Sequence, residues 1–393
     1  MGPTLPFSPP AAAVGAYLLI AAATGVAVRL RAHVYHKDLA GDDETAFHLR
    51  RLRGRGVLVG AALTVAVTAG FRVGTAAGDA FAEAVDAETG VAGLDDGTAV
   101  DTVAGVVGAS AAYLVPIALV VLVVRLATVP YQRAARDLRL RYRDAAAWEL
   151  KRSGVGVVGL LAAVGVIAAV PSGWPRALVA VGLGFLVTVL APVALVVALR
   201  TRWPTDAEHA LVADLLPHGV ALRVVDDRTR VGSAFTAGVI PGLKRVFVTE
   251  SLFDVLDDEQ LRAVVAHEVG HHEHNHVLLR FSLVAAAASV ALTVASYAPV
   301  ATVYGLVAGG VPLAVGLAWA VRHTERAADA YAAAVVGGPA LAGALEVLAD
   351  RRYITAASGP FGLLEYHPPL AERIERLRAS SKRAVARTES LRP

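Results

Sequence analysis

Long apolar stretches separated by charged segments dominate the first half of the chain. Five of them approach the roughly 20 residues that a helix needs to cross a bilayer, and two more follow residue 277. These seven candidate spans lie at about 9–28, 56–71, 103–124, 154–170, 177–199, 278–296 and 301–321. The pattern predicts a mainly α-helical, polytopic membrane protein with about seven spans.

Charges between the apolar stretches predict the orientation in the membrane. Residues 29–55 and 125–153 are rich in arginine, whereas 72–102 holds a single basic residue, Arg72, among several acidic ones. Basic residues prefer the cytoplasmic side. We therefore expect a plasma-membrane protein with its N-terminus outside and with the segments around residue 267 and the C-terminus inside.

A polar segment between the fifth and sixth spans has the pattern of a small α+β domain. Residues 221–227 and 244–250 are rich in β-branched side chains and bounded by turn formers, which predicts two strands. Residues 257–276 read as a helix, with Asp257 as N-cap and Gln260 three positions later.

Composition supports the membrane assignment and narrows the chemistry. Hydrophobic residues make up 55% of the 393, charged residues 18%, and the mean hydropathy is +0.55. The net charge of +3 comes mainly from arginines beside hydrophobic runs, so we expect a lipid bilayer and no nucleic acid as partner. No cysteine is present, so a metal ion must bind through nitrogen and oxygen.

Five of the twelve histidines lie within "AHEVGHHEHNH", residues 266–276. His267 and His271 are four positions apart, so both imidazoles project from one face of a helix and can converge on one zinc ion. Glu268 between them is offset by about 100° and can reach water at the metal without ligating it. The alternative is a solvated helix whose histidines are surface polar residues.

A catalytic zinc ion needs a third protein ligand. The metzincin spacing fails because positions 274 and 277 hold histidine and valine in place of glycine and histidine. Just after the last apolar stretch, two carboxylates lie one helical turn apart, Glu325 and Asp329. Unpaired carboxylates beside an apolar segment carry a high desolvation free energy, so we expect both to have binding partners. Glu325 as third ligand and Asp329 as partner of a ligand histidine would explain both, whereas simple ion pairs with Arg322 or Arg326 are the alternative.

The order of four stretches resembles the membrane zinc endopeptidases of the HtpX and CAAX prenyl protease family. These stretches are "SAFTAGVIPGLKRVFVTESLFDVLDDEQL", the HExxH helix, "ERAADAYA" and "HPPLAERIERL", within about residues 205–377. The resemblance implies His267, His271 and Glu325 as ligands of one zinc ion per chain, Glu268 as general base and Asp329 as a supporting acid. It carries no information on the first five spans.

The resemblance also implies a substrate-binding edge strand. Its positions here are Ser233, Ala234, Phe235 and Thr236, whose backbone would pair with an extended substrate. Relatives usually begin this strand with asparagine, so the serine at 233 puts a side-chain role there in doubt.

Two residues near the C-terminus match a family element close to the active site. His367 could donate to the oxyanion that develops during attack on the peptide carbonyl, and Arg373 could contribute to substrate binding. Pro368 and Pro369 suit a plain turn equally well.

The remaining histidines of the cluster have no assigned chemistry. We expect His274 at the polar surface, and His272, His276 and His323 as solvated or capping residues.

The sequence thus predicts five segments and one main function. The segments are 1–202, a membrane domain with about five transmembrane helices; 203–280, a cytoplasmic zincin-like protease domain; 281–322, a transmembrane hairpin; 323–377, the C-terminal part of the catalytic domain; and 378–393, a disordered tail. The expected function is an integral-membrane zinc metalloendopeptidase acting on membrane-associated or misfolded proteins. The alternatives are a signalling protease with one specific partner and a non-catalytic metal-binding membrane protein.

Overall fold

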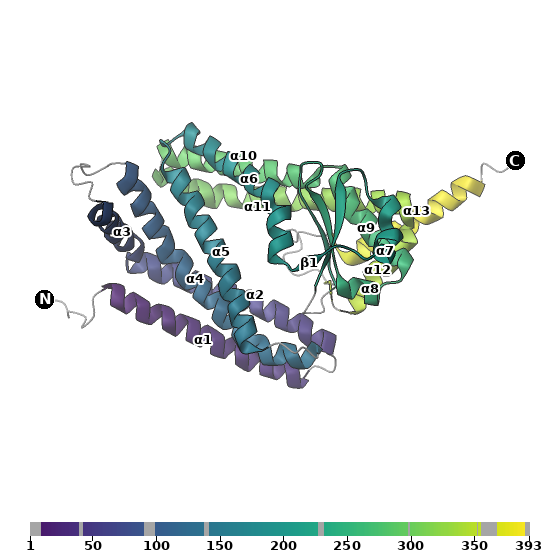
Figure 1. Ribbon diagram of the computed structural model, residues 1–393, viewed down its shortest axis with the longest axis horizontal. Coiled ribbons are helices and arrows are strands. Elements are labelled where there is room, and N and C mark those ends of the chain that lie inside the picture. Colours follow the sequence, from purple (N-terminus) through teal and green to yellow (C-terminus); the bar gives the residue numbers. More distant parts are fainter. Residues whose placement is uncertain are drawn as a thin grey trace. The chain divides into compact units, whose positions relative to one another are not determined.

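The computed structural model describes residues 9–38, 42–89, 99–136, 141–226, 232–297, 299–351, 353–354 and 368–389. Its internal contacts divide the chain into two compact units, Met1–Val179 and Ala180–Pro393 (Figure 1). Helices dominate both units, and a small sheet lies in the second. The mainly helical fold that the hydrophobic pattern predicts is confirmed.

The first unit packs long helices against one another at short distance. Its helices are α1 (Pro9–Asp38), α2 (Asp42–Gly70), α3 (Val73–Thr89), α4 (Ala99–Arg136) and α5 (Tyr142–Ala168). A Cβ atom added at Gly25 or Gly60 would lie 2.5 Å from a valine of α4. Small residues let helix backbones approach in this way, which is how membrane helices associate without a hydrophobic driving force.

Part of the acidic segment 72–102 is helical, although the sequence pattern predicted no helix there. Residues 73–89 form helix α3, which packs on α4, where a Cβ at Gly78 would lie 2.6 Å from the Gly105 carbonyl oxygen. Alanine is the strongest helix former and is frequent in this segment, so local propensity favours a helix despite the acidic charge.

Six helices in the described part of the chain are long and apolar enough to span a membrane. They lie in α1, α2, α4, α5, α6 (Trp174–Ala198), and in residues 315–350 of the helical run from α11 (Pro299–Ala332) onward. The seventh expected span, at 278–296, falls in α10 (His276–Tyr297), and the part of this helix whose side chains are described, His276–Val290, is apolar.

The sheet of the second unit has four strands in the order β1-β2-β4-β3. The strands are β1 (Thr201–Arg202), β2 (Val220–Val225), β3 (Ala234–Ala237) and β4 (Lys244–Thr249). β2 and β4 are parallel, whereas β3 pairs antiparallel with β4 and forms one edge. The strands predicted at 221–227 and 244–250 are therefore confirmed.

Alternating side chains divide the sheet into two apolar faces. Leu222, Val246 and Val248 join a core with α9 (Asp258–Glu273) and α12 (Gly338–Asp350). On the opposite face, Phe247 and Ala237 pack against the end of α6. The sheet thus holds the HExxH helix on one side and a candidate membrane span on the other.

Helix α9 begins as predicted and ends earlier than predicted. Asp257 and Gln260 form the expected capping box. The helix stops at Glu273, because Asn275 adopts a left-handed conformation with φ 51°, and α10 begins at His276. Asparagine is among the residues that tolerate this conformation best. The continuous helix predicted for 257–276 is therefore wrong at its C-terminal end.

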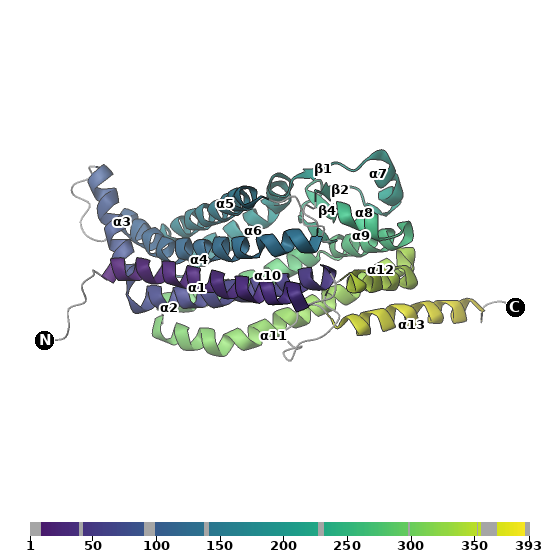
Figure 2. The ribbon, with the colours of Figure 1, turned by 90° about the horizontal axis from the view of Figure 1, so that it is seen from below.

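The C-terminal part of the second unit is helical. A π-helical turn at Ala333–Gly337 joins α11 to α12. Figure 2 shows these two helices following one another. Short elements α7 (Asp206–Val212), a 3₁₀ turn (Ala213–Leu215) and α8 (Glu250–Val255) complete the domain. Helix α13 (Leu370–Glu389) extends into the segment 378–393, where we expected disorder. Its start is anchored by the buried Leu370, Arg373 and Leu377.

Candidate metal centre

The two histidines of the HExxH motif lie side by side on α9. His267 and His271 are 8% and 5% exposed, and their ring centroids are 5.0 Å apart with perpendicular planes. The four-residue spacing places both on one face of the helix, as the sequence predicts.

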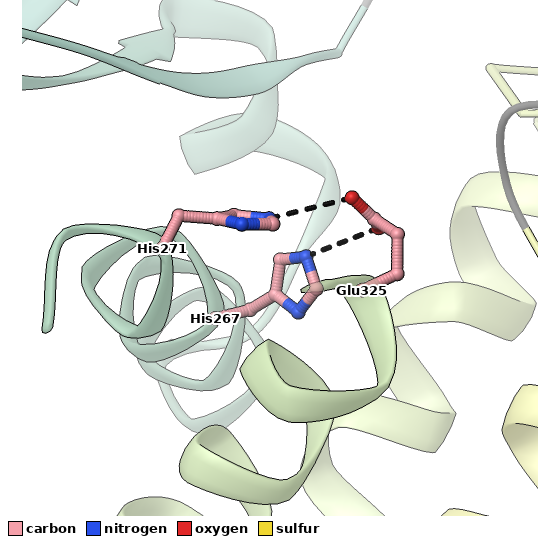
Figure 3. A group of neighbouring side chains, drawn as sticks. All are labelled: His267, His271 and Glu325. Carbon is pink, nitrogen blue, oxygen red and sulfur yellow. Dashed lines mark ion pairs between the residues drawn. The ribbon is translucent and has the colours of Figure 1, made fainter. Parts of the chain in front are cut away.

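Glu325 of α11 faces both imidazoles (Figure 3). Its Oε2 lies 3.6 Å from His267 Nε2, and its Oε1 lies 3.4 Å from His271 Nε2. Two atoms about 2.0–2.1 Å from a zinc ion at a tetrahedral angle lie about 3.4 Å apart. The three side chains therefore fit a single zinc ion held by two nitrogens and one carboxylate.

A glycine within the motif permits this convergence. A Cβ at Gly270 would lie 3.1 Å from both Ala328 Cα and Tyr331 Cβ of α11. The backbones of α9 and α11 therefore approach at the one position of HEVGH that has no side chain. This close contact brings Glu325, about one turn before Ala328, to the two histidines.

The second nitrogen of each ligand histidine has its own partner. His267 Nδ1 lies 3.1 Å from Asp329 Oδ1, at ion-pair distance but without hydrogen-bond geometry, and His271 Nδ1 lies 2.8 Å from His276 Nδ1. Partners of this kind fix the ring orientation of metal-binding histidines. Both Nε2 atoms are left to face Glu325.

Arginines balance the two buried carboxylates. Arg373 donates from Nε and Nη2 to the two oxygens of Asp329, at 2.9 and 2.6 Å. Arg280 donates from Nη2 to Thr324 Oγ1 at 2.7 Å and to Glu325 Oε1 at 3.1 Å. Paired in this way, the charges avoid most of the cost of burying an isolated carboxylate.

Burial and ion pairing move the pKa values of the motif in different directions. Burial lowers the pKa of His271 to about 3. Burial also opposes protonation of His267, but its ion pairs with Asp329 and Glu325 outweigh that effect and raise its pKa to about 9. Burial raises the pKa of Glu268 to about 7. Glu268 is thus set to exchange a proton near neutral pH, which general acid–base catalysis requires.

The strand predicted to bind substrate forms the edge of the sheet next to α9. Thr249 N donates to Ser233 O at 3.0 Å, which makes these two residues a hydrogen-bonded pair of the antiparallel ladder. Because such pairs alternate, the backbone groups of Ala234 and Thr236 point away from β4. These groups lie on the free edge of the described sheet, whereas the backbone groups of Phe235 face Phe247 of β4. An extended peptide could add to this edge.

Other sequence predictions have different outcomes. His367 lies outside the described residues. Arg373 is 8% exposed, and its guanidinium donates hydrogen bonds to Asp329. It therefore contacts the carboxylate beside His267 and is not available at the surface. His274 and His323 are exposed, as expected.

The expectation that His272 and His276 are solvated is wrong. They are 2% and 4% exposed, because His272 points into the sheet and His276 follows the break in the helix and turns back toward His271. Arg280 was missed as well, although a lone arginine within the apolar run 277–290 was a usable signal.

Comparison with known proteins agrees with this geometry. Residues 210–381 match Peptidase family M48. The chain is 29% identical to the protease HtpX homolog of Desulforapulum autotrophicum in an alignment 195 positions long that covers 40% of this chain and 63% of the relative. It is 28% identical to the HtpX homolog of Caldanaerobacter subterraneus, over 45% of this chain and 74% of the relative. The chain thus spans less than two thirds of the first relative's length.

The fold also resembles a solved structure. The crystal structure of S. mikatae Ste24p superimposes with a TM-score of 0.55, covering 96% of this chain and 100% of that chain at 16% sequence identity. At this identity the likeness concerns the fold. The segment that matches Peptidase family M48 contains His267, His271 and Glu325, so this part of a multi-pass membrane protein is similar to the HtpX-like metalloproteases of that family.

Proposed function

We propose that this protein is an integral-membrane zinc metalloendopeptidase that hydrolyses peptide bonds of membrane-associated or misfolded proteins. One observation carries the proposal. His267, His271 and Glu325 converge from two helices, with the glutamate of the HExxH motif buried beside them. This donor set suits one zinc ion per chain.

Glu268 is the general base of the proposed reaction. When bound, a zinc ion supplies Lewis-acid chemistry that polarises the scissile carbonyl and makes water more acidic. Glu268 accepts the proton from the attacking water and delivers it to the departing amine. Its burial supports both roles, because a carboxyl group with a pKa of about 7 can accept and release a proton near neutral pH.

The edge strand β3 would hold the substrate. Outward-facing amide and carbonyl groups at Ala234 and Thr236 can bond to an extended peptide, whatever its side chains. Recognition through the backbone suits an enzyme that acts on unfolded segments of many proteins. Ser233 lies at the start of the strand, and its backbone already bonds to Thr249.

The position of Glu325 suggests where substrates come from. The carboxylate belongs to α11, whose residues 315–332 form part of a candidate membrane span. The ligand thus lies close to apolar helix surface, as expected for an active site near the membrane boundary. The arginine-rich segments 29–55 and 125–153 support placing this boundary on the cytoplasmic side.

The central test is the variant Glu268→Gln. Loss of the base should reduce kcat/KM for casein or a fluorogenic peptide by about 10² to 10⁴-fold, while the zinc content stays at one per chain. Glu273→Gln is the matched control, because Glu273 is an exposed glutamate near the end of the same helix. Wild-type rates in the Glu268 variant would contradict the mechanism.

The same variant separates the alternatives. If the protein is a protease with many substrates, many membrane proteins should stay uncleaved in cells that carry Glu268→Gln. If it is a signalling protease, only its one specific partner should stay uncleaved. A non-catalytic metal-binding protein should be indifferent to the substitution. Comparative proteomics of membrane fractions makes the distinction.

A further inference from the structure

His272 follows a metal-binding histidine but points toward the sheet. Its side chain is among the largest fully buried ones in the described chain, and its Nε2 contacts Thr236 Oγ1 and lies 3.2 Å from Arg245 O. Its backbone oxygen accepts a bond from Lys244 Nζ at 3.2 Å. One residue thus connects α9 to both β3 and β4.

These contacts define a hydrogen-bond network around Thr236. A carbonyl oxygen only accepts, so the bond to Arg245 requires the hydrogen of His272 on Nε2. That hydrogen is shared between Arg245 O and Thr236 Oγ1, and the threonine hydroxyl in turn donates to Arg245 O at 3.3 Å. Thr236 is therefore held from two sides.

Thr236 lies between the free edge of the sheet and helix α9. Its backbone groups face the free edge, where the proposed substrate would pair, while its side chain reaches back to His272. In the described sheet, β3 has a neighbouring strand on one side only. The hydrogen bonds to β4 fix its register, and the contact with His272 fixes its distance from the helix that carries His267 and His271.

We propose that His272 is a positioning residue that sets the substrate-binding edge strand at the correct distance from the metal centre. This inference rests on the proposed protease function. Catalysis requires the scissile carbonyl and the attacking water to be placed to within about 1 Å, and a misplacement of that size costs on the order of 10²-fold in rate. A rigid link between α9 and β3 provides this placement, because α9 carries the catalytic residues.

The test uses His272→Phe and Thr236→Val, which remove the polar contact from either side while keeping similar volume. Each should lower kcat/KM for an extended peptide by about 10 to 100-fold, shift part of the cleavage to neighbouring bonds, and leave zinc content unchanged. The double variant should be no worse than the poorer single variant, because both remove one contact. His272→Gln, which restores an N–H donor, should recover part of the loss.

Several outcomes would overturn the proposal. These are wild-type kinetics and cleavage sites in both single variants, additive losses in the double variant, or loss of zinc in His272→Phe. Glu273→Gln serves again as the control on the same helix. Hydrogen–deuterium exchange provides a readout independent of activity, since residues 233–238 should exchange faster in both variants while α9 is unchanged. If the wild type itself cleaves nothing, the proposed function fails, and unaltered exchange in the variants would reject the positioning role separately.

Discussion

Each metal-binding histidine has a different kind of partner on its second ring nitrogen. The partner of His267 is the negatively charged carboxylate of Asp329, whereas the partner of His271 is the imidazole of His276. An anionic partner makes a histidine a stronger electron donor and favours its protonation when no metal is bound. Removal of the two partners should therefore have unequal effects on metal binding.

Asp329→Asn tests the anionic partner. The amide preserves shape but removes the charge, so zinc affinity or activity should fall by about 10 to 100-fold. Competition with a chromophoric chelator measures the affinity. Asp214→Asn is the control, because Asp214 forms an exposed ion pair with Arg262 in the same unit. Equal zinc affinity in the wild type and Asp329→Asn would show that Asp329 does not act through His267.

The sequence predicted the residues that share a local motif and missed those that depend on tertiary packing. His267 and His271 follow from helical spacing, and Glu325 was inferred because a carboxylate beside an apolar stretch needs a partner. The burial of His272 depends on the location of β3, and that of His276 on a break in the helix. Neither is encoded by the residues immediately around them.

At the level of elements, capping and alternation were reliable guides. The Asp257–Gln260 capping box and the β-branched runs predicted the start of α9 and the positions of β2 and β4. The end of α9 was not predictable in the same way. Asparagine is compatible with a helix and with the left-handed conformation that Asn275 adopts, so its residue type does not mark the end of the helix.

The approach of α9 to α11 at Gly270 leads to a prediction about packing. Gly270→Ala should destabilise the second unit by about 1–3 kcal/mol and weaken zinc binding, because the new Cβ meets the backbone of α11 at 3.1 Å. Gly343→Ala is the matched control, since its Cβ would meet only the flexible end of Gln260 at 3.3 Å. Thermal unfolding and zinc affinity of the two variants provide the comparison, and equal behaviour would contradict the prediction.

The junction between α6 and α7 should make stability depend on pH. Arg202 donates to both oxygens of Glu208 at 2.7 Å, and this bond lowers the pKa of Glu208 to about 2. A carboxylate with a lowered pKa contributes stability above its ordinary pKa of about 4.5, and this contribution is lost as pH falls through about 2.

Glu208→Gln should therefore cost about 1–2 kcal/mol at pH 7, a range that allows for screening near the surface. The difference in unfolding midpoint between this variant and the wild type should shrink as the pH is lowered from about 5 toward 2. Glu375→Gln, at an exposed position of α13, should show no such pH-dependent difference. A difference for Glu208→Gln that stays constant with pH would mean that the ion pair is not its source.

For the whole molecule, hydrophobic segments were easier to predict than their boundaries. Apolar runs indicated the membrane helices, but the observed helices extend into charged flanks, as α2 does from Asp42 to Gly70. Charged residues such as glutamate and arginine favour helices but lower the hydropathy. A hydropathy pattern therefore marks the membrane-embedded part of a helix and does not mark its ends. The helix α3 was missed for this reason.

The absence of cysteine offers a direct test of the predicted orientation, because any introduced cysteine is the only thiol in the chain. Glu83→Cys in α3, Arg143→Cys in α5 and Glu259→Cys in α9 all replace exposed residues. The arginine distribution predicts that a membrane-impermeant maleimide labels the cysteine at 83 in intact cells. The cysteines at 143 and 259 should react only after the membrane is permeabilised. Labelling at 259 in intact cells would place the metal centre outside the cell, and the proposed protease would then reach only substrates on that side.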